Sequence, residues 1–272
     1  DSFYFAHKEL DSLFFHDERL QLRYNDLRNS ISNESPKSSY TCFQDALKND
    51  RIDFFFLGDF NEVEITESLK SLPFTARKGD VTIQYHQSYS NVLQEGMVQR
   101  NVGQSILELG YHSPVKYGDD EHLSMLVMNG LLGEFAHSKL FTNVRENAGI
   151  AYSVSSQLDL FSGLLRMYAG IDRGNRNQAR KMMNHQLMDL KKGNFTDFEL
   201  EQTKEMIRRS LLIAQDNQQT LVERAYLNAL FGKSSFDMDR LVAKLESVDK
   251  EAVCKAANSL KLQAIYFMEG VE

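Results

Sequence analysis

The sequence predicts an α+β fold, on three observations. Short segments with continuous or alternating apolar residues, typical of strands, are separated by longer segments with the apolar spacing of helices. Their order along the chain is strand, helices, two strands, paired helices and a closing strand, which indicates α+β layers. The chain has 272 residues, 42% of them hydrophobic and 25% charged, so it can bury one or two cores.

The first part of the chain is predicted to be mainly helical. The apolar residues of 20–31 recur at helical spacing, which predicts a helix over 8–31, and a second helix is expected over 38–48 after a polar break at Pro36. The run Phe54-Phe55-Phe56-Leu57 predicts a strand buried on both faces. Asn61, with Glu64 three residues later, is expected to cap a helix that ends before Pro73.

The polar segment 75–80 is the best candidate for a linker. Beyond it, the pattern predicts the following elements, in chain order. They are strands over 81–86 and 97–111, a helix over 123–135 capped by Asp119 or Asp120, a strand over 164–171, helices over 175–192, 196–215, 220–231 and 238–260, and a strand over 262–269.

Residues 129–156 are the stretch around which the other elements can be arranged. Two helical pieces with one apolar face, broken at Gly133 or at the turn 136–138, run into a strand over 151–156. Gly149 is expected to turn the chain out of the second piece. Arg145 and Tyr152 would then lie on either side of a helix-to-strand turn.

A guanidinium and a phenol close together on a turn could hold a carbonyl or a carboxylate, since both groups donate hydrogen bonds. The residues alone leave another interpretation open. Arg145 could form a surface ion pair with Glu146, and Tyr152 could pack into a core.

The composition excludes some classes of function. Binding of nucleic acid needs clustered positive charge, whereas the net charge is −7 and the 31 Lys and Arg residues are scattered. No apolar run approaches the ~18 residues of a membrane span. Cys42 and Cys254 are far apart in helical patterns, which favours reduced core thiols and a cytoplasmic protein.

The segment LFTNVRENAGIAYSVSS resembles a signature in the C-terminal half of the insulinase/pitrilysin zinc peptidases, the inverzincins. Relatives of that family include mitochondrial processing peptidase and the core proteins of the respiratory chain. The segments 52–73 and 104–111 are also similar to family segments and lie in family order. The resemblance covers roughly residues 40–272.

The resemblance implies a mostly antiparallel sheet covered by helices, within a domain that the family carries in duplicate. Residues 1–75 would be the C-terminal part of a first α+β domain, and 76–80 a linker. Residues 81–272 would be the second, non-catalytic domain.

The family's zinc motif, H-x-x-E-H, is missing from this sequence. The nearest segment, 118–122, keeps Glu121 and His122 but has Gly118 in place of the first His, and two protein ligands do not make a zinc site. No metal ligand or catalytic residue is therefore predicted on this chain. The resemblance implies a zinc-metallopeptidase relative that is not active alone.

By the same resemblance, Arg145 and Tyr152 hold the peptide substrate across a cavity from the zinc-bearing half. The implied partners are a peptide and either a catalytic subunit with H-x-x-E-H, which would carry the zinc, or a second copy of the chain. The alternative is a structural or peptide-binding subunit that has lost catalysis.

Overall fold

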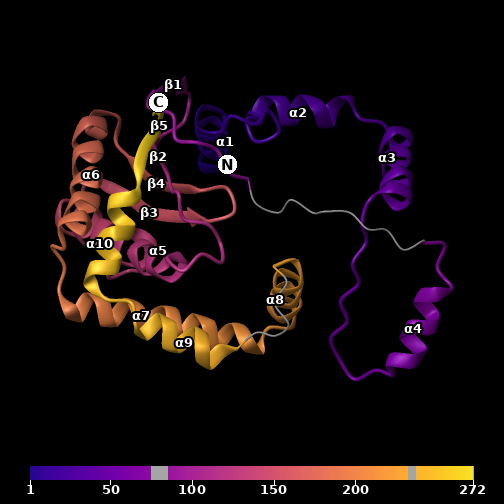
Figure 1. Ribbon diagram of the computed structural model, residues 1–272. Helices are drawn as coiled ribbons and strands as arrows, with labels where there is room; N and C mark the ends of the chain where they lie inside the picture. Colours follow the sequence, from indigo (N-terminus) through magenta and orange to yellow (C-terminus); the bar gives the residue numbers. More distant parts are fainter. Residues whose placement is uncertain (75–84, 232–236, 272) are drawn as a thin grey trace. The chain divides into compact units, whose positions relative to one another are not determined.

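The computed structural model describes residues 1–74, 85–231 and 237–271 (Figure 1). The chain divides into two compact units. Unit 1 comprises Asp1–Leu27, Ile83–Ser210 and Met238–Glu272, and unit 2 comprises Arg28–Thr82 and Leu211–Asp237. The predicted linker 76–80 and most of the predicted strand 81–86 lie outside the described residues, so the division into domains at this point stays a prediction.

Unit 1 contains a five-stranded sheet in the order β1-β5-β2-β4-β3 within the described residues. The strands are β1 (Gln94–Arg100), β2 (Ser105–His112), β3 (Ala151–Asp159), β4 (Leu164–Ile171) and β5 (Lys261–Gly270). The pairs β2–β4, β2–β5 and β3–β4 are antiparallel, and β1 pairs with β5 in parallel. The predicted α+β class, with a mostly antiparallel sheet covered by helices, is confirmed.

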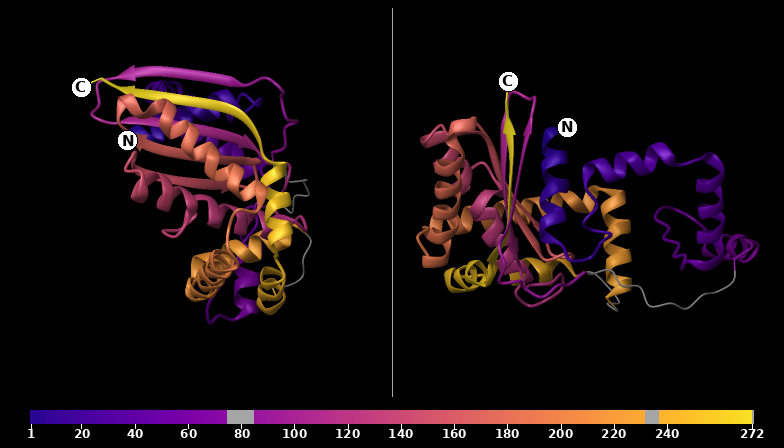
Figure 2. Two further views of the ribbon diagram at one scale, coloured as in Figure 1. Left: turned by 90° about the vertical axis from the view of Figure 1, so that its left-hand side faces the viewer. Right: turned by 90° about the horizontal axis from the view of Figure 1, so that it is seen from above.

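Helices cover both faces of this sheet (Figure 2). The face opposite α1 carries α5 (His122–Asn129), α6 (Arg176–Lys192) and α10 (Lys250–Ser259), and α10 contacts both α5 and α6. Two π-helical segments, η1 (Gly130–Glu134) and η2 (Leu140–Asn147), pack against β3. The helices α7 (Asp197–Ile213) and α9 (Met238–Glu246) follow α6 in the chain. Among the described residues, no helix is long and apolar enough to cross a lipid bilayer.

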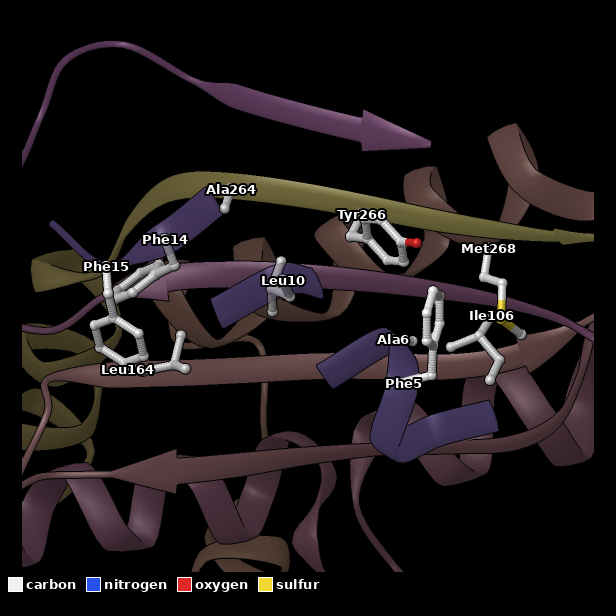
Figure 3. Close-up of a cluster of buried hydrophobic side chains, with 10 residues drawn as sticks. All are labelled: Phe5, Ala6, Leu10, Phe14, Phe15, Ile106, Leu164, Ala264, Tyr266 and Met268. Carbon is white, nitrogen blue, oxygen red and sulfur yellow. The ribbon is translucent and has the colours of Figure 1, made fainter. Parts of the chain in front are cut away.

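Helix α1 (Ser2–Phe14) packs on the other face of the sheet, against β1, β2 and β5 (Figure 3). Leu10 and Phe14 are fully buried and Phe5 nearly so. Burying side chains of this size contributes roughly 1.5–3 kcal/mol each to holding the helix on the sheet. The whole cluster is Phe5, Ala6, Leu10, Phe14, Phe15, Ile106, Leu164, Ala264, Tyr266 and Met268.

The predicted helix over 8–31 is wrong in its middle. Helix α1 ends at Phe14, because Phe15 has extended backbone angles and is itself buried beside Phe14. A separate helix, α2, spans Tyr24–Asn33. Phe14 and Phe15 both belong to the buried cluster, so the chain changes from helix to extended conformation inside this core.

Two other long predictions each correspond to two elements. The expected strand over 97–111 is β1 and β2 with a turn between them, and β5 lies between these two strands in the sheet. The expected helix over 238–260 is α9 and α10, because Asp249 caps the start of α10.

The expected cap of α5 by Asp119 or Asp120 is wrong. Within the described residues, no side chain caps this helix, and Asp119 instead accepts a hydrogen bond from the backbone of Lys116. The other helices and strands predicted beyond residue 112 are confirmed within a few residues.

Unit 2 contains α3 (Pro36–Asn49), α4 (Glu62–Lys70) and α8 (Gln218–Leu230), together with most of α2. The caps of α3 and α4 form at Ser35 and Asn61. The predicted strand over 54–57 is not formed: these residues pair with no other described strand, and Phe54, Phe56 and Leu57 are about half exposed. Cys42 is exposed and Cys254 is half-buried, so the expected position of both thiols in a core is wrong.

Candidate functional site

Segment η2 places Arg145 at the surface. Its apolar residues Leu140 and Val144 are fully buried against the rest of unit 1, which leaves Arg145 on the outer side with 42% of its side chain exposed. The guanidinium carbon lies 4.7 Å from the centre of the Phe141 ring, and Nε lies 3.7 Å from Glu146 Oε1. The Phe141 ring packs against one face of the planar guanidinium. The N–H donors lie at the edges of that plane and stay available for hydrogen bonds.

The chain leaves η2 through Gly149, whose φ of 61° lies in the left-handed region, as predicted. The backbone N–H groups of Gly149 and Ile150 donate to the carbonyls of Arg145 and Val144, at 3.1 and 3.2 Å, and close the helical end. Strand β3 begins directly afterwards. The turn therefore holds the backbone of Arg145 and the first residues of β3 together.

Tyr152 is the extra residue of a β-bulge. Ala151 lies opposite Ile171 and Ser153 opposite Gly170, so the pairing of β3 with β4 shifts by one residue at Tyr152. Among the described strands, β3 is at the edge of the sheet, where bulges commonly redirect a side chain. The ring of Tyr152 is 62% exposed, which rules out the open interpretation that it packs into a core.

The phenol of Tyr152 donates a hydrogen bond of 2.7 Å to Asp172 Oδ1, just beyond the end of β4. This bond to an anion, together with the charge of Asp172, raises the pKa of Tyr152 above its ordinary value of 10. The phenol thus stays protonated at neutral pH, and its proton is held by Asp172. A substrate oxygen would compete with Asp172 for this proton.

We expect Asp172→Asn to lower the pKa of Tyr152 toward 10, because the substitution removes the anionic acceptor. The measurement is a pH titration of the Tyr152 ring carbons by NMR, with the resonance identified from a Tyr152→Phe variant. Asp189→Asn, on α6, is the matched control and should leave the titration unchanged. An unchanged Tyr152 titration in Asp172→Asn would show that the carboxylate does not hold the phenol in solution.

Segment η1 packs against β3 and is joined to it by hydrogen bonds. Ser155 Oγ donates to the carbonyl of Gly133, at 2.8 Å, and Ser156 Oγ donates to Asn129 Oδ1, at 2.7 Å. A Cβ on Gly133 would lie 2.6 Å from the backbone nitrogen of Ser156, so only glycine permits this approach. The helical stretch 122–134 ends after Glu134, because Phe135 has extended backbone angles. Gly133 lies inside the helical stretch and permits its close packing against β3. The hydroxyl residues of β3 anchor the strand that carries Tyr152.

Both predicted site residues lie at the surface of unit 1, on either side of the predicted turn. Each has its own partners, and no hydrogen bond, ion pair or ring contact joins Arg145 to Tyr152 in the part of the chain that the structure describes. The Arg145–Glu146 pair that the sequence left open is present, but at this exposure such a pair contributes little. Two exposed donor groups flank the turn.

The segment most similar to a zinc motif does not fit a metal. Gly118 has no side chain, Glu121 Oε1 lies 3.0 Å from Lys255 Nζ, and the ring of His122 contacts that of Tyr117. Across residues 1–74, 85–231 and 237–271, no group of three or more His, Cys, Asp or Glu side chains is arranged to hold a metal ion. The donor set needed for zinc is thus not found in the described residues.

A buried charged group under α1 was not predicted. Glu108, in the centre of β2, is completely buried and contacts His7 Nδ1 of α1. Its other oxygen lies 3.4 Å from Arg166 Nε, without the geometry of a hydrogen bond, and Arg166 also pairs with Asp11 of α1. A lone glutamate within the apolar run SILELGY was the signal in the sequence, but nothing in the sequence identified its partners.

Burial raises the pKa of Glu108 and of Asp11 in the folded protein, and the positive charges of His7 and Arg166 only partly offset this. A raised pKa means that the folded state binds the proton more tightly than the unfolded state. Protonation of each carboxyl group therefore stabilises the folded state. This contribution is fully present below the unfolded pKa of the group, 4.5 for Glu108 and 3.8 for Asp11. It is lost as the pH rises through the folded pKa.

We expect the free energy of unfolding of the wild type, relative to Glu108→Gln, to fall as the pH rises from below 4.5 through the folded pKa of Glu108. The neutral amide removes this titration and leaves Asp11 in place. Urea denaturation of both proteins over a pH series measures the difference. A difference that rises with pH over this range would show that the charged partners, and not burial, dominate.

Residues 34–207 match the family model described as the peptidase M16 inactive domain. Among curated proteins, the chain is 29% identical over 252 residues to YmfF of Bacillus subtilis, named a probable inactive metalloprotease. The match covers 92% of this chain and 59% of that relative.

Among solved structures, a conserved protein from Enterococcus faecalis V583 is 35% identical, with a TM-score of 0.95. The match covers 100% of this chain and 64% of that one. A chain of complex III2 from Candida albicans is 13% identical, with a TM-score of 0.73. That match covers 97% of this chain and 66% of the Candida albicans chain, and at this identity it shows only a shared fold. The chain thus spans less than two thirds of each of these proteins.

Proposed function

The chain belongs to the peptidase M16 family, through its inactive domain, and from this we propose that it is the zinc-free, substrate-holding half of a peptidase that encloses peptides. The observation that carries the proposal is the exposed pair of donors at the η2–β3 turn. The other half, which bears H-x-x-E-H, would hold the zinc. This chain would contribute binding and orientation of the peptide.

The chemistry of the two side chains suits this role. Arg145 offers a rigid fork of N–H donors that matches a carbonyl or carboxylate, and the Phe141 ring limits the entropy lost on binding. Tyr152 offers a phenol whose proton is retained at neutral pH. Donors that are fixed before the reaction lower the energy of the charge that develops on a substrate oxygen.

The need for a partner is supported by unit 2. None of its described residues is buried, although half of the large apolar side chains that are exposed in the described chain lie in it. Ordering a residue costs about 1–2 kcal/mol of conformational entropy, which a unit without a core cannot offset. The backbone groups of residues 54–57 also pair with no strand among the residues that the structure describes. We propose that strands of the zinc-bearing half cover this unit.

A second function, that of a structural or peptide-binding subunit without catalysis, is favoured by one observation. The phenol of Tyr152 is already bound to Asp172, and Arg145 to Phe141 and Glu146, so neither group is poised for a reacting oxygen in this structure. Under that function, the chain would bind peptides without any cleaving partner. We propose a cytoplasmic location in either case, which the two free thiols support.

The experiment that tests the proposal is the purification of the native gene product, with its intact mass and zinc content measured on one sample. We expect this chain to be joined to, or associated with, a polypeptide that carries H-x-x-E-H, with about one zinc ion per assembly. A native assembly without zinc and without such a polypeptide would contradict the proposal and leave the non-catalytic subunit.

A further inference from the structure

A cavity of about 560 Å³ opens in unit 1 beside the β3–β4 hairpin. Its walls come from the end of α1 and the loop after it, the start of α5 and the two strands of the hairpin. The volume lies within the roughly 300–1,000 Å³ that is typical of ligand sites. All lining residues belong to the same compact unit, so the cavity does not depend on the placement of unit 2.

The walls are mainly apolar. Phe15, Leu126 and Leu164 supply side chains from three different elements. The rings of Tyr117 and Phe161 stack at 4.8 Å with 16° between their planes and form an aromatic side of the cavity. Such a surface favours another ring, because offset and edge-to-face contacts add to the free energy of apolar burial.

The two carboxylates in the wall are already paired. Asp11 is held by Arg166, which also lines the cavity, and 13% and 11% of their side chains are exposed. Arg166 Nε is directed at Glu108, 3.4 Å away. Asp159 accepts hydrogen bonds from the backbone of Phe161 and from the hydroxyl of Ser162, at 2.9 and 2.5 Å. A charged ligand would lose its hydration without gaining an unpaired partner from either carboxylate, whereas a neutral ring loses little.

We propose that this cavity is a subsite for a neutral aromatic side chain of the bound peptide. The inference rests on the proposed function, since it assigns a position of the peptide that the η2–β3 turn holds. Strand β3 connects the two places: Tyr152 is near its start and Leu158, which lines the cavity, near its end. Six residues of strand span on the order of 20 Å, so the aromatic residue lies about six residues of extended peptide from the turn.

The test uses the chain with two small probes, N-acetyl-L-phenylalanine amide and N-acetylglycine amide, titrated by NMR. Gln157, which is exposed and lines the cavity, is replaced in Gln157→Trp so that the indole can fill the cavity. Lys192→Trp, on an exposed position of α6, is the matched control. Thermal unfolding of each variant confirms that the fold is retained.

We expect the phenylalanine probe to bind with shifts at residues of the cavity, and the glycine probe not to bind. Gln157→Trp should raise the Kd by about tenfold or more, a loss of about 1.4 kcal/mol, and Lys192→Trp should not change it. Equal binding of the two probes, or an unchanged Kd in Gln157→Trp, would overturn the proposal.

The probes require neither cleavage nor a partner, so this result is independent of the proposed function. If the phenylalanine probe does not bind while Arg145 is still required for peptide turnover, only the subsite is wrong. If the phenylalanine probe binds but Arg145 has no role in turnover or peptide binding, the cavity binds aromatic groups without being part of the proposed peptide site. That result overturns both the proposed function and the assignment of the cavity as a peptide subsite.

Discussion

Arg145→Ala is expected to lower kcat/KM of the assembled peptidase about 100-fold, the size of effect seen when one preorganised donor to a developing oxyanion is removed. The stability of the chain should not change, because 42% of the side chain is exposed and its apolar neighbours in η2 stay in place. The measurements are peptide turnover with the zinc-bearing half present and the thermal midpoint of the chain alone.

Two variants control this result. Arg145→Lys keeps the charge but loses the planar fork, so it should recover only part of the activity. Arg209→Ala removes an exposed arginine that pairs with Glu205 on α7 and should leave turnover unchanged. Turnover by Arg145→Ala at the wild-type rate would remove Arg145 from the site.

Arg166→Ala is expected to destabilise the chain by about 3–5 kcal/mol, the range found when one partner of a buried ion pair is removed. Glu108 is completely buried and would keep only His7, and Asp11 would keep only the partly exposed Lys8. Since α1 carries His7 and Asp11, its attachment to the sheet should weaken first. Urea denaturation gives the free energy, and amide exchange of residues 2–14 locates the loss.

Arg180→Ala is the matched control, because its pair with Glu95 is about 34–45% exposed and worth less than about 1 kcal/mol. Adding Glu108→Gln to Arg166→Ala should recover part of the lost stability, since the buried carboxylate that has lost the arginine is then replaced by a neutral amide. A loss in Arg166→Ala no larger than that in the control would show that the buried group does not hold α1.

Local patterns predicted most of unit 1. The predicted helices over 175–192 and 196–215 correspond to α6 and α7, and strand β4 was predicted with the bounds it has. The errors fall at breaks that the apolar pattern did not mark. Apolar residues continue through Phe15, where helix α1 ends. The β1–β2 turn is short, residues 101–104, and contains Gly103, a turn residue that was read as part of one long strand.

The strand predicted at 54–57 shows a different limit. Its apolar sequence is suited to an inner strand, but a strand forms only where neighbouring strands complete its hydrogen bonds, and none of the described residues does so. The sequence therefore indicates that residues 54–57 require neighbouring strands, but it does not indicate which residues would form them.

The candidate site came from a resemblance, since spacing alone left Arg145 and Tyr152 open to a structural interpretation. The structure adds that both are exposed and that a β-bulge turns Tyr152 outward. Asp172 was not predicted as the partner of Tyr152, because it is 20 residues away and only the β3–β4 pairing brings it near.

The most direct test of the central claim, that the η2–β3 turn holds the peptide, is hydrogen exchange of the chain with and without a bound peptide, in wild type and Arg145→Ala. We predict that peptide slows exchange of the amides of residues 145–153 and that the substitution abolishes this protection. Slowed exchange confined to other segments, or protection that is the same in both proteins, would contradict the account.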